Sequence, residues 1–573
     1  MPTIQQVSIG QETMAIKTKS HSGKAIPDAR GINLYHADPD AAALFAHYLP
    51  DPLFRHLEPT FDYLGALAGG RLDELATIAD HNPPTLTVRR RTGEDCNVID
   101  KHPAYIEMER LAFSEFGLAA LSHRGALGWP DPMPPAAKYA LTYLFVQAEF
   151  GLMCPVSMTD SLTRTLKRYG DPNLVARFIE RLTTLDFDEL VQGAMFMTEQ
   201  GAGSDVSATT TRALLQPNGT WKLTGDKWFC SNADADLAMV LAQSEDVPGM
   251  KGISLFLLPK IKSDGLPNDY RILRLKDKLG TRSMASGEIR LEGAEAYLVG
   301  ERGRGFNQMA DMVNNSRLSN GVRAAGLMRR AVTEALFVSR HRQAFGKRLI
   351  ELPLMRRQLV KMLVWAEQAR TMMFLTAGAL DRADRSDAVG AKLARILTPL
   401  IKFRACRDAR KVTGDAMEVR GGCGYIEEWA DARLLRDAHL GSIWEGTSNI
   451  VALDVLRAIS RDDALPALKT WDDALLGVAS LDSQTQALFA ETLNRACAFA
   501  AEVAAKKSEA LARQAASALY HITSAIGLAR EAATCGTPHR RVLAQMVLTH
   551  RLRPRDPLGG DVDAADFDDV LAN

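Results

Sequence analysis

The sequence predicts an α+β fold in which a small β-barrel follows one helical domain and precedes another. Three observations support this prediction: helical spacing of apolar residues over 35–190, several strand-length apolar runs over 191–304, and a return of helical spacing from 305 onward. The chain has 573 residues, of which 46% are hydrophobic. This is enough material for a large core, and it excludes a disordered chain or a small disulfide-stapled fold.

The N-terminal part divides into an arm and a helical domain. Residues 1–34 mix Gly, Lys, Ser and Pro without periodicity, which is typical of an arm. Residues 35–190 are predicted to form helices separated by proline bends. Leu162, Leu166 and Tyr169, for example, share one helical face, and Asp160 is the expected N-cap of that helix.

A β-barrel domain is predicted over residues 191–304. Two strand-like runs flank Asn218-Gly219, a pair that favours a tight hairpin turn. Further runs of strand length occur at 237–242, 253–258 and 287–292. Several short strands within one such segment predict a small barrel or sandwich.

The remaining residues are predicted to be helical again. Over 305–460, apolar positions such as Met355, Leu359, Met362 and Leu363 follow a helical period, which predicts a helical bundle. Residues 461–573 continue as an Ala-rich helical extension that ends in an acidic tail at 561–569.

Composition limits the function classes. Lys and Arg total 69, as do Asp and Glu, so the chain does not have the basic surface of a protein that grips a polyanion all over. Seven cysteines without CxxC pairs suit free thiols, and no HExxH motif or other metal-ligand cluster occurs, so we expect no metal site. No run of about 18 apolar residues and no secretion signal is present, so we expect a cytoplasmic protein with no membrane span.

Four segments carry candidate chemistry: 197–205 (MTEQGAGSD), 227–232 (KWFCSN), 342–347 (RQAFGK) and 443–450 (IWEGTSNI). The first is a Gly-rich turn that could hold an anion or a ring oxygen, or be an ordinary tight loop. Arg342 could pair with a pyrophosphate or be a solvated helix-end cation. Glu445 could be a base with a raised pKa, or an acid at the start of a helix.

Taken together, the order and spacing of these segments resemble the acyl-CoA dehydrogenase flavoprotein family over roughly residues 140–460. The resemblance implies an N-terminal helical domain, a middle β-barrel domain and a C-terminal four-helix bundle, here followed by the helical extension. Trp444 stands where the family usually has Tyr. With the segments at 82–86, 102–105 and 416–428, this points to the AidB-like, alkylation-response branch of the family.

The resemblance also implies bound FAD and a homotetramer in which a neighbouring subunit completes each FAD site. Thr198 would hydrogen-bond the flavin ring, and Phe229 would stack on it, in place of the family's Trp. Arg342 and Phe345 would reach the cofactor of a partner subunit. The full set of implied cofactor residues is Met197, Thr198, Ser204, Phe229, Ser231, Arg342, Phe345, Gly422, Ile443, Trp444, Thr447 and Asn449.

The implied reaction is α,β-dehydrogenation of an acyl-CoA or related thioester. Glu445 would remove the α-proton while hydride passes to flavin N5, and an electron-transfer flavoprotein is the expected acceptor. Ser204 and Arg317 would lie near the substrate, although Arg317 also suits a structural ion pair. This makes the protein an oxidoreductase.

The AidB-like branch offers an alternative, a flavoprotein that protects DNA from alkylation with only vestigial dehydrogenase activity. In that branch the extension supplies a basic face for DNA. Here residues 461–573 hold 12 Lys and Arg against 15 Asp and Glu. We therefore interpret the basic run at 539–555 as a solvated helix end neutralised by the acidic tail, and DNA binding is not favoured.

Overall fold

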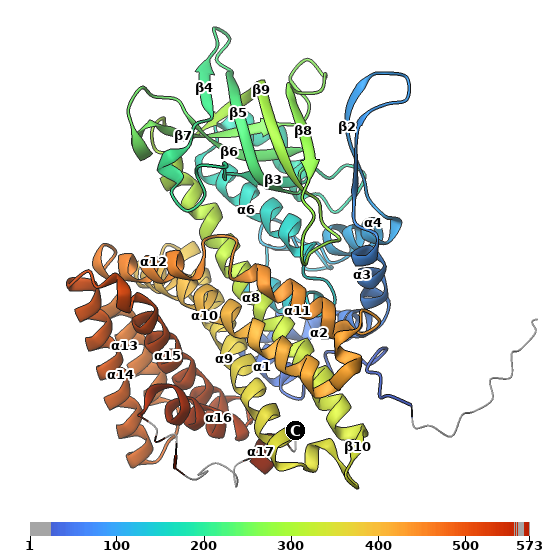
Figure 1. Cartoon of the computed structure of the whole chain (residues 1–573). Helices are drawn as coiled ribbons and strands as arrows, with labels where there is room; N and C mark the ends of the chain where they lie inside the picture. The colour runs from blue at the N-terminus through green and yellow to red at the C-terminus, as the bar shows by residue number, and fades with distance from the viewer. Residues whose placement is uncertain (1–24, 555, 557, 560–566, 572–573) are drawn as a thin grey trace, which may run out of the picture.

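The computed structural model describes residues 25–554, 556, 558–559 and 567–571. Most of the predicted arm, residues 1–24, and most of the acidic tail, residues 561–566, lie outside them. Within the described residues, Figure 1 shows a β-barrel at one end of the molecule and helices filling the rest. The predicted α+β order of helical domain, barrel, bundle and helical extension is confirmed.

The N-terminal helices form one domain with a β-hairpin inserted in it. The hairpin pairs β1 (Thr85–Arg89) with β2 (Asp95–Asp100), and the sequence did not predict it. It leans on the barrel, because the Asn97 side chain bonds the backbone of Tyr270 and Ile272. The helices are α1 Ala41–Tyr48, α2 Asp51–Gly69, α3 Arg71–His81, α4 Pro103–Arg110, η1 Leu111–Glu115, α5 Pro135–Phe145, α6 Met153–Tyr169 and α7 Pro172–Thr183.

The prediction that Asp160 caps a helix is wrong. Helix α6 begins at Met153, seven residues earlier. Pro155 does not prevent this, because it lies in the first turn, where a proline is tolerated. Asp160 is therefore inside the helix. Its carboxylate is buried and accepts a hydrogen bond of 2.9 Å from the Lys138 ammonium.

Seven strands make the middle barrel: β3 Gly193–Phe196, β4 Arg212–Leu215, β5 Trp221–Ser231, β6 Leu237–Gln243, β7 Ile253–Pro259, β8 Tyr270–Leu275 and β9 Ser286–Val299. The pairings β4–β5–β9–β7–β6 close on themselves because β6 also pairs with β4, and β3 and β8 pair in addition with β6 and β9. The predicted hairpin is present, with Ala213 opposite Leu223 and Gly219 in the turn at φ +82°. The barrel has its own apolar core, which includes Phe196 and Trp221.

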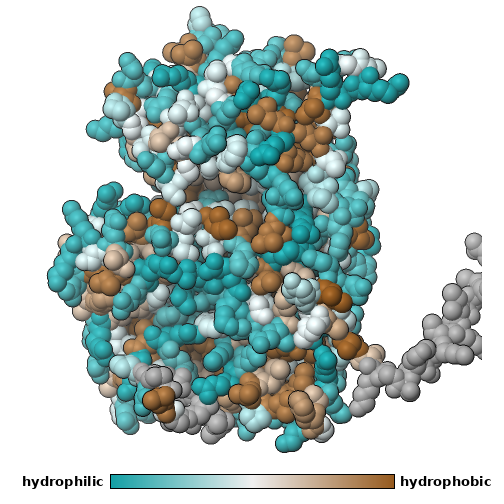
Figure 2. Space-filling view, viewed as in Figure 1, coloured by the Kyte–Doolittle hydropathy of each residue, from teal (hydrophilic) through white to brown (hydrophobic). Residues whose placement is uncertain are grey.

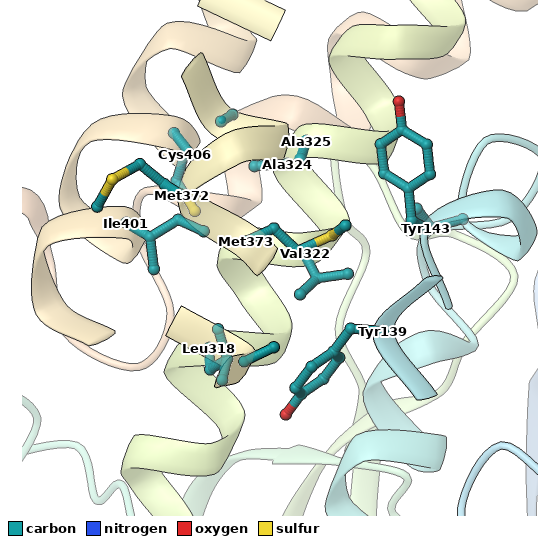
Figure 3. Packing of buried hydrophobic residues seen from close by; sticks show 14 of the residues in the cluster. Tyr139, Tyr143, Leu318, Val322, Ala324, Ala325, Met372, Met373, Ile401 and Cys406 are labelled. Atoms are coloured by element: carbon teal, nitrogen blue, oxygen red, sulfur yellow. The ribbon is translucent and has the colours of Figure 1, made fainter. Parts of the chain in front are cut away.

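Three long helices form the centre of the C-terminal bundle. Figure 3 shows their contact: Leu318 and Val322 of α8 face Met373 of α9, with Ile401 of α10 alongside. Gly321 lets the helices approach, since a Cβ there would lie 2.8 Å from Ile401. The elements are α8 Gly305–His341, β10 Gln343–Ala344, β11 Lys347–Arg348, η4 Leu349–Glu351, α9 Pro353–Asp384, α10 Ala388–Arg420, η5 Gly421–Tyr425, α11 Ala430–Gly441 and α12 Ser448–Ser460.

The extension packs against α9, α10 and α12 rather than standing apart (Figure 1). Its elements are α13 Ala464–Gly477, α14 Ser483–Ala505, η6 Glu509–Leu511, α15 Ala512–Thr534, α16 His539–Val547, η7 Leu548–Leu552 and α17 Phe567–Leu571.

The interpretation of residues 539–555 as a solvated helix end is wrong for its first residues. Arg540 has no exposed surface, and its charge is matched by Asp40, Glu367 and Glu531, which come from outside the tail. His539 also contacts Asp40, at 2.9 Å. Packing of α16 onto the core draws these two side chains inward, which a linear count of charges cannot reveal.

Candidate functional site

The loop between α11 and α12 has an unusual backbone at Glu445 and Gly446. Both residues are left-handed, with φ of +55° and +95°, a conformation that is unfavourable for glutamate. Two cations hold it in place. Arg317 Nε of α8 donates to the Glu445 carbonyl at 3.0 Å, and Lys402 Nζ of α10 donates to the Gly446 carbonyl. The position of Glu445 is thus set by two helices of the bundle.

The Glu445 carboxyl points into the protein. The residue as a whole is partly exposed, but Oε2 is buried and has no hydrogen-bond partner. Burial raises the pKa of this carboxyl, while Ser316 and the charges of Arg317, Lys402 and Arg323 act in the opposite direction. A carboxylate with a raised pKa is a stronger base, so the environment suits proton abstraction.

Arg317 forms the structural ion pair that the sequence offered as one alternative, and its place near a substrate stays a prediction. It bonds the Glu445 backbone, and its Nη1 also forms an ion pair of 2.7 Å with Asp454. Asp454 in turn pairs with Arg395 at 2.8 Å. Arg317 is therefore a structural ion-pair residue that lies directly beside the candidate base.

Trp444 forms an aromatic wall next to Glu445. Its ring lies 6.0 Å from that of Phe150, nearly parallel at 15°. The guanidinium of Arg323 lies 4.6 Å from the Trp444 ring centre and 5.4 Å from that of Phe150. The indole Nε1 of Trp444 is buried and has no partner.

The barrel contributes the opposite side of the site. The Trp228 amide donates to the Thr198 carbonyl at 2.8 Å, so the predicted segments 197–198 and 228–231 lie side by side. Ser231 interacts with the thiol of Cys154, and Arg323 and Glu445 act on the same thiol. The structure therefore brings the barrel segment and the candidate base together around Cys154.

Two large apolar side chains on these segments are left open to solvent. Phe229 of β5 is 56% exposed and Ile443 of the 442–447 loop is 59% exposed. Figure 2 shows the surface hollowed between the barrel and the helices below it. Ser204, Thr447 and Asn449 are exposed as well, while Met197 and Thr198 are partly buried.

Three other predicted cofactor residues lie at the far end of α8. Arg342 Nη1 donates to the Arg420 carbonyl at 2.9 Å, next to the exposed Gly422, and Phe345 is 94% exposed. Arg317 and Arg342 are 25 positions apart on α8 and its C-cap, or about 38 Å along the helix axis. One chain thus carries two separate groups of predicted cofactor residues.

Sequence reasoning missed four residues of the site: Phe150, Cys154, Arg323 and Lys402. A signal for Arg323 was present, because it is a charged residue among Val322, Ala324 and Ala325 on a buried helix. The other three lack a local signal, since only packing brings them to Glu445.

The described residues contain no group of three or more His, Cys, Asp or Glu side chains that could hold a metal ion. Among the same residues, no helix is both long and apolar enough to cross a membrane. The seven cysteines are free thiols.

Family models match three consecutive parts of the chain. These are the adaptive response protein AidB N-terminal domain at 25–189, the acyl-CoA dehydrogenase middle domain at 194–294, and the acyl-CoA dehydrogenase C-terminal domain at 303–460.

Relatives extend this match. AidB of Escherichia coli (strain K12) is 35% identical over 400 residues, which cover 68% of this chain and 71% of AidB. Acyl-CoA dehydrogenase family member 11 of Caenorhabditis elegans is 31% identical over 461 residues, covering 78% and 74%.

Solved structures agree. The Caenorhabditis elegans ACDH-11 structure in complex with C11-CoA has a TM-score of 0.86 at 26% identity and covers 96% of each chain. An acyl-CoA dehydrogenase from Bacillus anthracis complexed with FAD has a TM-score of 0.63, covering 82% of this chain and 89% of that one. At 18% identity it shows the fold alone.

Proposed function

The chain belongs to the acyl-CoA dehydrogenase family, with an AidB-type N-terminal domain, and from this premise we propose that it dehydrogenates an acyl thioester with FAD as cofactor and Glu445 as base. The observation that carries the proposal is the Glu445 carboxyl, held inward with an unpartnered buried Oε2. A buried acceptor without a partner is uncommon and suits an atom that waits for a substrate proton.

The residues around Glu445 fit a flavin. Phe229 and Ile443 offer exposed apolar surface on the barrel and the bundle, as a ring held between them requires. Thr447 and Asn449 lie at the N-terminus of α12, whose free amides favour phosphate. When bound, FAD supplies the hydride acceptor.

The protein's own part in the reaction is positioning and proton removal. A thioester carbonyl acidifies its α C–H bond, so a desolvated carboxylate can abstract that proton. Arg317 and Lys402 fix the backbone on either side of the carboxylate, which holds Glu445 Oε2 in one place. The Trp444 and Phe150 rings keep water from the same side.

We propose further that a second copy of the chain completes each cofactor site within a homotetramer. Arg342, Phe345 and Gly422 are about 38 Å along α8 from the Glu445 loop, too far for one FAD to reach both groups. The nearly full exposure of Phe345 supports this assignment, since a partner would cover it. An electron-transfer flavoprotein remains the proposed electron acceptor, and the cytoplasm the proposed location.

The DNA-protecting alternative has less support. Arg540, at the start of the basic run, is fully buried and paired with carboxylates, so it cannot contact a phosphate backbone. Arg551, further along, packs its guanidinium 4.6 Å from the Trp365 ring centre. The run is therefore partly used inside the protein.

The test is an anaerobic titration of the FAD-loaded protein with a panel of acyl-CoAs, followed by flavin absorbance. One thioester should bleach the oxidised band, and Glu445→Gln should slow bleaching about 10²- to 10⁴-fold, the usual effect of removing a general base. Glu180→Gln, an exposed acid on α7, is the matched control and should bleach at the wild-type rate. Bound FAD that no thioester bleaches would refute the proposal.

A further inference from the structure

Helix α8 carries a buried arginine that forms no close ion pair, although Glu445 is near enough to act on its charge. Arg323 is 1% exposed, and its Nη1 has no hydrogen-bond partner. Its Nε donates to the Ser319 carbonyl at 3.4 Å, and its guanidinium also interacts with the Cys154 thiol. It forms no ion pair with any carboxylate of the described part of the chain. Burial disfavours its charge and lowers its pKa, yet guanidinium groups stay protonated in proteins.

The same helix shows what a structural buried arginine looks like. Arg329 lies 3.3 Å from Glu367, and Arg330 lies 2.9 Å from Glu334 and 3.3 Å from Asp73. Both are as buried as Arg323. Arg329 and Arg330, which have a structural role, are thus paired with carboxylates. Arg323, which lies beside the candidate base, forms no ion pair.

Other polar atoms near Arg323 are also unpartnered. Ser316 and Asn320 lie on the same face of α8, seven and three residues before it, and their side-chain oxygens Oγ and Oδ1 are buried without partners. Trp444 Nε1 and Glu445 Oε2, on the neighbouring loop, also lack a partner within hydrogen-bond distance, although Ser316 faces the Glu445 carboxyl. We call these five residues the α8 niche. Native proteins satisfy nearly all buried polar groups, so such a concentration indicates that a ligand group belongs there.

We propose that Arg323 binds a carboxylate carried by the acyl chain of the thioester substrate. The proposal rests on the proposed function and narrows its substrate to acyl-CoAs with an acidic acyl group. A guanidinium pairs with a carboxylate through two parallel hydrogen bonds, which would satisfy Nη1. A plain alkyl chain in the same place would leave the charge buried and unpaired.

The position of Arg323 also limits the chain length. Its guanidinium lies over the ring of Trp444, the residue next to Glu445, and both Cys154 and Glu445 act on it. A substrate whose α-carbon faces Glu445 therefore reaches Arg323 with a short acyl chain. Arg323 is a substrate-binding and specificity-determining residue in this proposal, not a catalytic one.

The experiment compares two acyl-CoAs of the same shape on the full-length, FAD-loaded protein. Glutaryl-CoA ends in a carboxylate, and 5-methylhexanoyl-CoA replaces both carboxylate oxygens with methyl groups. Succinyl- and adipoyl-CoA test shorter and longer spacing. Affinity is measured by anaerobic calorimetric titration, and flavin bleaching is followed in parallel.

Wild type should prefer the dicarboxylic acyl-CoA of best-fitting length. Arg323→Met should weaken that ligand about 10- to 100-fold, as expected for losing a charge-assisted pair, and should leave 5-methylhexanoyl-CoA unchanged or tighter. Arg323→Lys keeps the charge and should retain part of the preference. If Arg323→Met is poorly folded, the Lys variant and Arg323→Gln supply the same ratio of affinities.

Three results would overturn the inference: no preference in wild type, equal weakening of both ligands in Arg323→Met, or a shifted pH profile with unchanged preference. The last would mean that Arg323 serves Glu445 instead. The same data distinguish failure of this inference from failure of the proposed dehydrogenation. Selective binding without bleaching would keep the inference and refute the reaction, whereas bleaching by neutral acyl-CoAs alone would do the reverse.

Discussion

Two fully buried arginines, one in the extension and one in the bundle, are surrounded in opposite ways. Arg540 of α16 uses all three of its side-chain nitrogens. Nε and Nη2 donate to Glu531 at 2.9 and 2.6 Å, and Nη1 donates to Asp40 at 2.9 Å and Glu367 at 2.5 Å. These carboxylates come from α15, the segment before α1, and α9, so one cation joins three parts of the chain.

Arg323 of α8 has none of this support. Two aromatic rings and two thiols surround it, and Glu445 is the carboxylate that acts on it. A buried ion network that is complete fixes the packing of the extension, whereas an incomplete one next to a strained loop suits ligand binding. Burial of a charge alone therefore does not identify a site, whereas a buried charge that lacks an ion pair points to one.

The largest effect is expected from removing each arginine in turn. Arg540→Met leaves Asp40, Glu367 and Glu531 buried without their cation, which should lower the free energy of unfolding by about 3–5 kcal/mol. Arg323→Met removes an unpaired buried charge and should leave stability unchanged or higher. Denaturant unfolding of the two variants beside wild type measures this.

Equal destabilisation by the two substitutions would contradict this expectation, because it would mean that Arg323 stabilises the fold as much as Arg540 does. Arg540→Lys is the matched control. It keeps the charge but not the fork of donors, and it should fall between wild type and Arg540→Met.

A smaller effect concerns the pH dependence of stability at the two places. Folding raises the pKa of Glu445 above its ordinary value of 4.5, so the folded state binds the proton more tightly than the unfolded state does. The contribution of Glu445 to stability therefore falls as pH rises above about 4.5. Folding lowers the pKa of Asp40 and Glu367, so their contribution is present above their ordinary values and is lost as pH falls through the acid range.

Glu445→Gln therefore should match wild type in stability near pH 4 and exceed it progressively toward neutral pH. For each unit by which folding raises the pKa of Glu445, the stability difference between the variant and wild type at neutral pH grows by about 1.4 kcal/mol. The groups facing this carboxyl are Ser316, Arg317, Lys402, Arg323 and Cys154. Unfolding curves at several pH values check the slope, and a stability difference that shrinks with rising pH would contradict it.

The sequence predicted most of the fold because the core elements follow strong periodic patterns. The β1–β2 hairpin escaped because its two strands are short and mostly exposed, and the alternation of Leu86 and Val88 with polar residues in β1 is too brief to stand out within a helical domain. Its anchor is Asn97, which bonds the backbone of Tyr270, 173 residues away. Asp160 was misplaced because only the apolar face from Leu162 onward was assigned to the helix, whereas α6 begins at Met153.

The site was predictable only where its residues form motifs. Glu445, Trp444 and the barrel segment were located from local patterns and a family resemblance, and their roles stay predictions. Arg323 and Lys402 belong to no motif. Their importance comes from their surroundings in three dimensions: Arg323 Nη1 has no hydrogen-bond partner, and Lys402 donates to the Gly446 carbonyl.

The smallest effect is expected at a third arginine, which is paired but accessible to water. Arg356 of α9 forms an ion pair with Asp568 of α17, and the Asp568 side chain is 82% exposed. Asp568→Asn should change the free energy of unfolding by about 1 kcal/mol or less, and high salt should remove the difference, because water and ions already screen this pair. The loss in Arg540→Met should persist in high salt, since solvent does not reach that cluster.

A loss above about 2 kcal/mol for Asp568→Asn would show that pairing matters here as much as in the interior. The contrast between Arg540 and Arg323 would then not depend on the exclusion of water, and the absence of partners around Arg323 would lose its value as a sign of a ligand.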